Sequence, residues 1–341
     1  MGDIAPAPAS APAAANAAPL RYIDAYLAPL VPVLSRPEVT DLFINRPGEV
    51  WVETLDGSTE RHAMPDLDEA SLWRLARQIA SLSHQGISRE HPLLSATLPD
   101  GARVQVVAPP ATRGSLIMAI RKHVVPDLTL ADYVGQGAFT RTRYSRGSAD
   151  LHAVDAPSGQ DPESLARFLG DLVRSRRNIL ISGGTSTGKT TFLNALLKEI
   201  PASERLVLIE DTAEVSLVHE NAAALLAAKG DLGEARVSAD DLLQAALRMR
   251  PDRIILGEVR GSEAYTFLRA VNTGHPGSIT TIHADSPEGA LEQLALIVLQ
   301  AGTRLRREDI IHYATGVIDA VVQLERRDGH RQIARIMMTR A

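Results

Sequence analysis

Gly183-Gly184-Thr185-Ser186-Thr187-Gly188-Lys189-Thr190 matches the pattern G-x-x-x-x-G-K-[ST], and its setting decides the fold. The apolar run 178–182 before it predicts a short buried strand, and residues 191–197 after it predict a helix. A strand, a glycine-rich turn and a helix N-terminus form an anion site, because unpaired backbone N–H groups and the helix dipole face the phosphates. Lys189 is expected to reach the β- and γ-phosphates, and the Thr190 hydroxyl to bind Mg²⁺. The stretch therefore predicts binding of a nucleoside triphosphate.

Outward from this loop, apolar strands alternate with helical segments through the second half of the chain. The expected strands are 178–182, 206–209, 254–256 and 279–282. Alternation of this kind predicts a largely parallel sheet that is buried on both faces. The chain closes with two apolar runs around Asp328-Gly329, which is a hairpin pattern. Residues 162–341 are therefore interpreted as an α/β phosphate-loop domain.

The first half of the chain has a different pattern. Short strand-like runs surround one amphipathic segment, residues 68–83, and predict a smaller α+β domain over residues 20–135. Residues 1–19 are mostly Ala and Pro and are interpreted as a disordered tail. Residues 136–161 contain Gly, Ser and Arg without a sustained apolar period, which predicts a linker.

Composition narrows the class of protein. The length of 341 residues favours about two domains, and the net charge of −5 argues against a dedicated nucleic-acid binder, so direct nucleic-acid recognition is not expected. The absence of cysteine excludes disulfides and cysteine-ligated zinc and is consistent with a reducing compartment. No apolar run approaches the roughly 18–20 residues that span a bilayer. A cytoplasmic protein is expected, with any membrane association peripheral and through partners.

Acidic residues follow two of the predicted strands. Glu210 and Asp211 come directly after residues 206–209, and Glu258 follows residues 254–256 through Gly257. Open α/β sheets bind ligands at the carboxyl ends of their strands. A carboxylate beside the phosphates can orient or deprotonate water, and a second one can hold Mg²⁺ through water. These are the expected roles of Glu210 and Glu258, although Glu210 and Asp211 could also simply cap the next turn.

Two histidines and two arginines are further candidates. A lone histidine is more often a structural hydrogen-bonding group than a catalytic one. The position of His283 at a predicted strand end favours a functional role, whereas His275, between Gly and Pro, suits a structural turn equally well. Arg103 and Arg121 lie on predicted strands of the first domain, where local sequence alone indicates surface charges.

Four segments carry a resemblance to a known family. They are 43–53 (FINRPGEVWVE), 98–105 (LPDGARVQ), 248–261 (RMRPDRIILGEVRG) and 270–284 (AVNTGHPGSITTIHA). With these motifs the chain resembles the secretion traffic ATPases over residues 20–340, specifically the VirB-type ATPases of bacterial type IV secretion systems. No departure from the family pattern removes a catalytic residue.

The resemblance implies roles for individual residues. Glu210 is the implied water activator in an acidic box, Glu258 belongs to Walker B and also supports Mg²⁺, and His283 senses the γ-phosphate. Arg103 and Arg121 would contact nucleotide phosphates. The implied Walker A residues that bind the nucleotide are Gly183, Gly184, Thr185, Ser186, Thr187, Gly188, Lys189, Thr190 and Thr191.

The resemblance also implies a fold and an assembly. It predicts a RecA-like ATPase domain behind a PAS-like N-terminal domain, with ATP and Mg²⁺ as cofactors. Members of the family form homohexameric rings at the cytoplasmic face of the inner membrane, together with other secretion components. The implied function is Mg-ATP hydrolysis that powers the assembly of a type IV secretion system or transport through it.

The sequence leaves three alternatives open. A pilus assembly or retraction motor would use the same chemistry in another machine. A RecA-like nucleic-acid translocase would show ATP hydrolysis stimulated by DNA with a strong dependence on salt. A non-hydrolysing nucleotide-binding scaffold is disfavoured by the presence of Glu210, Glu258 and His283.

Overall fold

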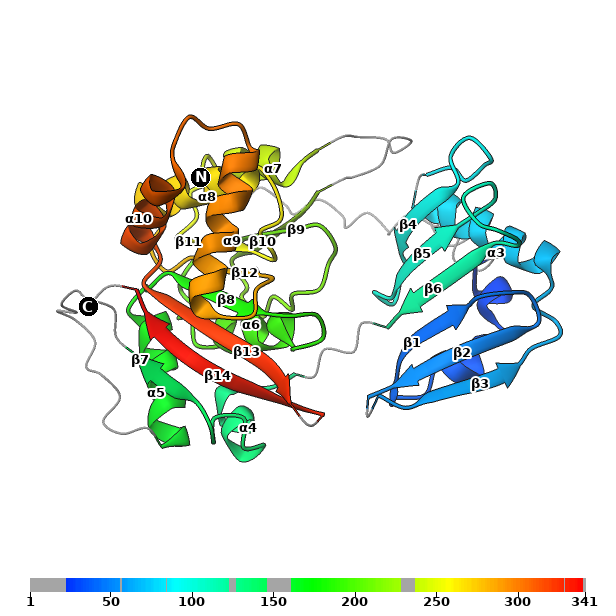
Figure 1. Cartoon of the computed structure of the whole chain (residues 1–341), viewed down its shortest axis with the longest axis horizontal. Coiled ribbons are helices and arrows are strands. Elements are labelled where there is room, and N and C mark those ends of the chain that lie inside the picture. The colour runs from blue at the N-terminus through cyan, green and yellow to red at the C-terminus, as the bar shows by residue number, and fades with distance from the viewer. Residues whose placement is uncertain are drawn as a thin grey trace, which may run out of the picture. The chain divides into compact units, whose positions relative to one another are not determined.

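A computed structural model describes residues 23–55, 57–83, 85–122, 127–145, 161–227, 237–327 and 329–339. The chain forms two compact units, of which the first holds the described residues up to Lys122 and the second those from Asp127 onward (Figure 1). The tail expected over residues 1–19 and most of the expected linker lie outside the described residues. Within the described ranges, every helix is too short or too polar to span a bilayer.

The first unit is built on a six-stranded antiparallel sheet in the order β3-β2-β1-β6-β5-β4. Its strands are β1 (Val39–Ile44), β2 (Glu49–Thr54), β3 (Thr59–Ala63), β4 (Leu93–Thr97), β5 (Arg103–Val107) and β6 (Ile117–Arg121), and its helices include α2 (Val31–Leu34) and α3 (Glu69–Leu82). Asp68 caps α3 by accepting a hydrogen bond from the Ser71 amide. Buried residues alternate along the central strands, because only one sheet face packs against the helices. This is the small α+β unit that the sequence predicts.

The second unit is an eight-stranded sheet in the order β10-β9-β11-β12-β8-β13-β14-β7. All neighbouring strands are parallel except β13 and β14, which form the hairpin that the sequence predicts. The strands are β7 (Arg143–Ser145), β8 (Ile179–Gly183), β9 (Leu206–Glu210), β10 (Ala222–Leu226), β11 (Arg253–Leu256), β12 (Ile279–Ile282), β13 (Ala320–Arg327) and β14 (His330–Met338). The predicted α/β architecture with a largely parallel sheet is confirmed, while β7 and β10 were not expected.

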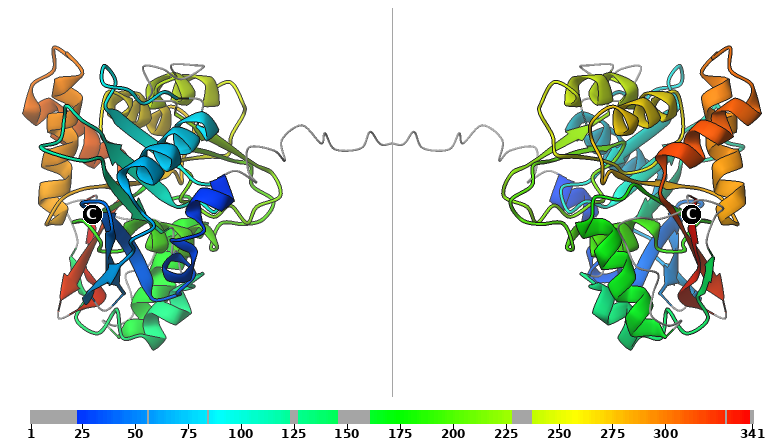
Figure 2. Two further views of the ribbon diagram at one scale, coloured as in Figure 1. Left: turned by 90° about the vertical axis from the view of Figure 1, so that its right-hand side faces the viewer. Right: turned by 90° about the vertical axis from the view of Figure 1, so that its left-hand side faces the viewer.

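Helices cover both faces of this sheet and make β8, β9, β11 and β12 fully buried. One face packs against α4 (Leu130–Gly135), α5 (Pro162–Arg174) and α6 (Lys189–Leu197). The other packs against α7 (Ala239–Ala246), α8 (Glu263–Asn272), α9 (Pro287–Gln300) and α10 (Arg307–Val317). Figure 2 shows α9 and α10, in orange, side by side.

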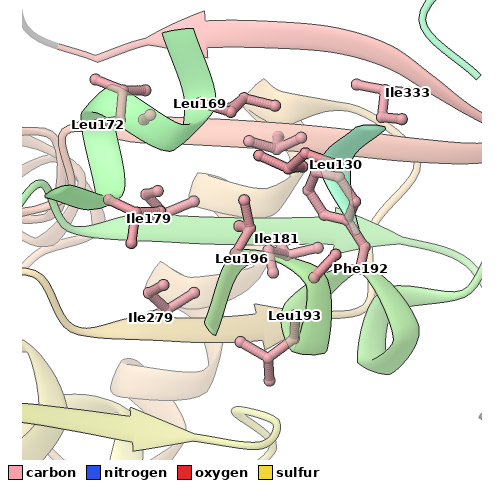
Figure 3. Packing of buried hydrophobic residues seen from close by; sticks show 14 of the residues in the cluster. Leu130, Leu169, Leu172, Ile179, Ile181, Phe192, Leu193, Leu196, Ile279 and Ile333 are labelled. Carbon is pink, nitrogen blue, oxygen red and sulfur yellow. The ribbon is translucent and has the colours of Figure 1, made fainter. Parts of the chain in front are cut away.

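The strand before the phosphate loop serves both cores. Ile179 and Ile181 of β8 face α5 and α6 (Figure 3). Leu180 between them faces the helices on the opposite side of the sheet. Asp161 caps α5 by accepting a hydrogen bond from the Ser164 amide, with Pro162 at the first helical position, as the sequence predicts. Because every residue of β8 is buried, the loop that follows it has a rigid base.

Helix α4 belongs to the second unit, although the sequence assigned residues 127–135 to the first. Tyr133 packs edge-on against Phe192 of α6 with ring centroids 5.2 Å apart, and Phe139 is fully buried in the same core. The Ile333 amide donates to the Ala138 carbonyl (2.9 Å), and Thr142 Oγ1 donates to the Ile333 carbonyl (2.6 Å). The described part of the expected linker is therefore packed onto the hairpin strand β14. The sequence pattern did not reveal this packing, because the segment has few apolar residues and several glycines.

Candidate nucleotide-binding site

The loop between β8 and α6 needs glycine at two positions. A Cβ on Gly183 would lie 2.5 Å from Thr187 Oγ1 and 3.1 Å from the Leu324 carbonyl oxygen, so a larger residue would force its neighbours to shift. Gly188 has φ +88°, in the left-handed region that favours glycine. Ser186 also has a positive φ of +61°. The glycines of the motif thus allow a tight turn directly over the end of a buried strand.

The N-terminus of α6 is open to an anion. Gly188 is the N-cap residue, and no side chain of the described residues caps this end. The first N–H groups of a helix lack intrahelical partners and carry the positive end of the helix dipole. The loop and the first turn of α6 therefore present several backbone donors where a phosphate can bind.

Lys189 is held in place within the loop. The residue is 8% exposed, and Nζ donates to the carbonyl oxygens of Gly183 (2.9 Å) and Gly184 (3.3 Å). The same nitrogen lies 3.3 and 3.4 Å from the two ring nitrogens of His283. Burial lowers the pKa of Lys189, and the carboxylate of Glu258 acts against this shift. An anionic ligand would favour the charged ammonium in the same way.

Glu258 and His283 meet beside Lys189. Glu258 follows β11 and His283 follows β12, and Glu258 Oε1 lies 2.8 Å from His283 Nε2. Burial lowers the pKa of His283, and the positive charge of Lys189 lowers it further. The imidazole is therefore neutral at pH 7 and can exchange hydrogen bonds with a phosphate or with water.

Arg260 joins this cluster. Its Nε donates to Glu258 Oε2 at 2.7 Å, and a second guanidinium nitrogen contacts the same oxygen. Sequence reasoning missed Arg260, even though it lies two residues after Glu258 in the segment 248–261. The signal that could have found Arg260 is its position two residues after the acidic candidate Glu258.

Glu210 and Glu214 lie at the next strand end. Glu210 is 6% exposed, and its Oε1 accepts hydrogen bonds from the amides of Glu214 (2.9 Å) and Val215 (2.8 Å). Thr190 Oγ1 donates to Glu214 Oε2 at 3.0 Å. A Cβ on Gly257 would lie 3.2 Å from Glu210 Cγ, so the glycine lets β11 end close to this carboxylate. Glu210 thus caps the turn that follows β9, which is one of the two roles that the sequence left open. It also lies at the ligand edge of the sheet.

The remaining candidates lie elsewhere. His275 precedes β12, at the strand end opposite to His283, and its Nδ1 lies 3.1 Å from the Pro251 carbonyl oxygen. Arg103 and Arg121 belong to the first unit, where they are direct cross-strand neighbours on β5 and β6. Arg121 Nε donates to Asp41 Oδ1 at 2.7 Å. The second unit therefore brings together Lys189, Glu258 and His283.

The oxygen atoms around the loop suit Mg²⁺. This ion usually binds through one or two carboxylates together with substrate phosphates and water, rather than in an all-protein cage. Thr190 Oγ1 and the carboxylates of Glu214 and Glu258 are hard oxygen ligands next to the open helix end. Among the described residues no group of three acidic, His or Cys side chains forms a complete metal cage.

Comparisons with known proteins identify the family to which the chain belongs. The family model described as "Type II/IV secretion system protein" matches residues 24–326. The chain is 37% identical over 327 residues to a type IV secretion system protein VirB11 from Bartonella quintana, with 91% of each chain covered. It is similar to the crystal structure of the VirB11 ATPase from the Brucella suis type IV secretion system in complex with sulphate, with 38% identity, a TM-score of 0.50, and 93% and 97% of the two chains covered. It also shares its fold with the pilus retraction motor PilT with bound ADP, at 20% identity, a TM-score of 0.58, and coverage of 91% and 82%.

Proposed function

The chain belongs to the family of type II/IV secretion system proteins, and we propose that it hydrolyses Mg-ATP to power a type IV secretion system. The observation that carries this proposal is the cluster of Lys189, Glu258 and His283 beside an uncapped helix end. Phosphoryl transfer needs a cradle for the phosphates, positive charge, and a carboxylate that supports metal and water. These groups lie within one edge of a rigid sheet.

Each residue of the loop has a role in this proposal. The backbone from Gly183 to Thr191 holds the phosphates, and Lys189 binds the β- and γ-phosphates. Thr190 binds Mg²⁺ directly, and Glu258 supports the ion through water. His283 lies against both Lys189 and Glu258, so a γ-phosphate that displaces these contacts would change its hydrogen bonds.

Glu210 is the proposed activator of the attacking water. Two backbone amides fix its Oε1, so that the carboxylate has one orientation before substrate binds. Such preorganisation is how a buried carboxylate acts as a base without a reorganisation cost at the moment of reaction. Its position next to Gly257 places it at the strand end beside Glu258.

The wider assembly is also part of the proposal. The second unit is RecA-like and the first PAS-like, and they act as separate domains. Six copies form a ring at the cytoplasmic face of the inner membrane with other secretion components. Arg103 and Arg121 contact nucleotide phosphates, which a pair of adjacent strand arginines can do with planar donor forks. A pilus motor is the second candidate, but the identity to the VirB11 protein over 91% of the chain favours secretion.

Substitution of Lys189 tests the proposal. Lys189→Ala removes the ammonium that Gly183 and Gly184 position, and phosphate release from Mg-ATP should fall about 10³-fold or more. Lys198→Ala is the matched control, because Lys198 lies at the end of the same helix and pairs with Asp127 at 2.6 Å. Its rate should equal that of the native chain. Native-like turnover in Lys189→Ala would contradict the phosphate-loop assignment, and mass measurement with and without Mg-ATP checks the hexamer.

A further inference from the structure

The two flanks of β8 carry different groups. Because the strand order is β11-β12-β8-β13-β14, Glu258 and His283 lie on one side of the phosphate loop and the β13–β14 hairpin lies on the other. The hairpin is close to the loop, since a Cβ on Gly183 would lie 3.1 Å from the Leu324 carbonyl oxygen. Side chains near the tip of this hairpin can therefore reach a bound nucleotide from the flank opposite Glu258 and His283.

An irregularity in the hairpin directs Arg331 toward the loop. Gln323 pairs with Arg335 but Leu324 pairs with Ile333, so Ala334 is an extra residue in β14. Ile336 and Ile333 both pack into the core on the α6 face, three positions apart instead of two or four. Figure 3 shows Ile333 in this core. Two residues further, Arg331 lies on this same face. Regular alternation from Ile336 would turn Arg331 to the opposite face, and bulges that re-aim a side chain are common next to active sites.

Arg331 lies across the last glycine of the phosphate loop. A Cβ on Gly188 would lie 3.1 Å from Arg331 Cδ and 3.5 Å from its Nε. The side chain is exposed, and its guanidinium has no hydrogen-bond or ion-pair partner among the described residues. A planar fork of donors is thus held beside a loop whose amides bind anions.

A second arginine faces the first. Arg326 of β13 pairs directly with Arg331, and it too is exposed and lacks an acidic partner in the described ranges. Like charges directly opposite each other across two strands are destabilising. An anion bound near this pair would remove that repulsion, which is a second indication of a negatively charged ligand here.

We propose that Arg331 is a nucleotide-binding residue that contacts the α-phosphate of the bound nucleotide. This inference rests on the proposed function, because it needs a nucleotide in the loop. Lys189 points to Glu258 and His283, so the γ-phosphate end lies on the β12 flank. The phosphate chain must extend away from that end toward the opposite flank, where the Arg331 side chain lies against Gly188 of the loop. Guanidinium groups pair with phosphate oxygens through two parallel hydrogen bonds.

Equilibrium binding of ADP and of a non-hydrolysable ATP analogue tests the contact. Arg331→Met keeps the apolar stem and removes the charge, and it should weaken both nucleotides about tenfold and equally. Arg331→Lys should recover part of the loss. Arg327→Gln is the matched control, because Arg327 lies on the same hairpin but pairs with His330 on the other face. Its affinity should match the native value.

Each other outcome is informative. Unchanged ADP affinity in both Arg331 variants would overturn the inference, and so would a loss confined to the ATP analogue, since that would place the contact at the γ-phosphate. Retained affinity in Arg331→Met with a loss in Arg331→Lys would mean packing on the base instead. If the native chain itself fails to bind ADP, the proposed function falls. If the native chain binds ADP and Lys189→Ala does not, the proposed nucleotide site stands, and the Arg331 variants then test the role of Arg331 alone.

Discussion

The ligand edge of the parallel sheet and the open face of the antiparallel sheet hold their charged residues differently. Glu258 and His283 follow strands that are buried on both faces, and they contact each other at 2.8 Å. Arg121 stands on a half-covered strand with its side chain 57% exposed and an ion pair to Asp41. Strands buried on both faces fix the position of the groups that follow them, whereas exposed arginines can adjust to what binds. The difference suggests chemistry at the first edge and ligand capture at the second.

The largest expected effect in this comparison comes from Glu210. Glu210→Gln keeps one side-chain oxygen for the amides of Glu214 and Val215, so the turn should stay folded while the base is lost. Hydrolysis of Mg-ATP should fall about 10²–10³-fold with nucleotide affinity unchanged. The measurement is phosphate release under saturating Mg-ATP, together with ADP binding.

Glu292→Gln is the control for this change, because Glu292 is an exposed carboxylate on α9 that pairs with Arg307. Its turnover should remain at the native level. If Glu210→Gln also hydrolyses ATP at the native rate, Glu210 is only the cap of its turn. The contrast between a fixed catalytic edge and an adjustable face would then lose its main support.

A smaller effect is expected on the antiparallel face. Arg121→Gln should slow hydrolysis about tenfold or somewhat more and leave ring formation intact, because the arginine would contact phosphate without holding the fold. The exposed pair with Asp41 contributes at most about 1 kcal/mol to stability. Turnover and mass measurement on purified rings separate these two readouts.

Arg61→Gln provides the matched control on the same sheet, since Arg61 of β3 also pairs with a carboxylate, that of Glu49. Equal rates for Arg121→Gln, Arg61→Gln and the native chain would show that the open face takes no part in hydrolysis. A loss in Arg121→Gln alone would sharpen the distinction between ligand capture and chemistry.

Local sequence signals predicted the parts of the molecule that local geometry dictates. The strand, the glycine turn and the helix around Lys189 follow from residues that are adjacent in the chain, and buried strands read as continuous apolar runs. The hairpin around Asp328-Gly329 and the N-cap Asp161 are of the same kind. Each of these features can be recognised from a single segment of the sequence, without its distant partners.

Pairing between distant segments explains what the sequence did not reveal. Residues 138–145 pack on β14, where the Ile333 amide donates to the Ala138 carbonyl and Thr142 Oγ1 donates to the Ile333 carbonyl, nearly 200 positions away. The extra residue Ala334, which turns Arg331 toward the loop, appears only in the register with β13. The roles proposed for Arg103 and Arg121 rest on the family resemblance, because a strand arginine has no local signature.

The smallest effect concerns the pH dependence of the fixed edge. Burial, and then the charge of Lys189, lower the pKa of His283 in the folded chain below its usual value near 6.5. Above that pH both states are neutral. As the pH falls below about 6.5 the unfolded chain binds the proton first, so the folded state loses stability until the pH reaches the folded pKa.

The free energy of unfolding of the native chain should therefore fall relative to His283→Gln between about pH 6.5 and 5. The side chain is 47% exposed and solvent screens its interactions, so the loss should stay below about 1 kcal/mol. Urea unfolding of both proteins at pH 8 gives the baseline, and a constant difference down to pH 5 would show that this edge is as well solvated as the antiparallel face.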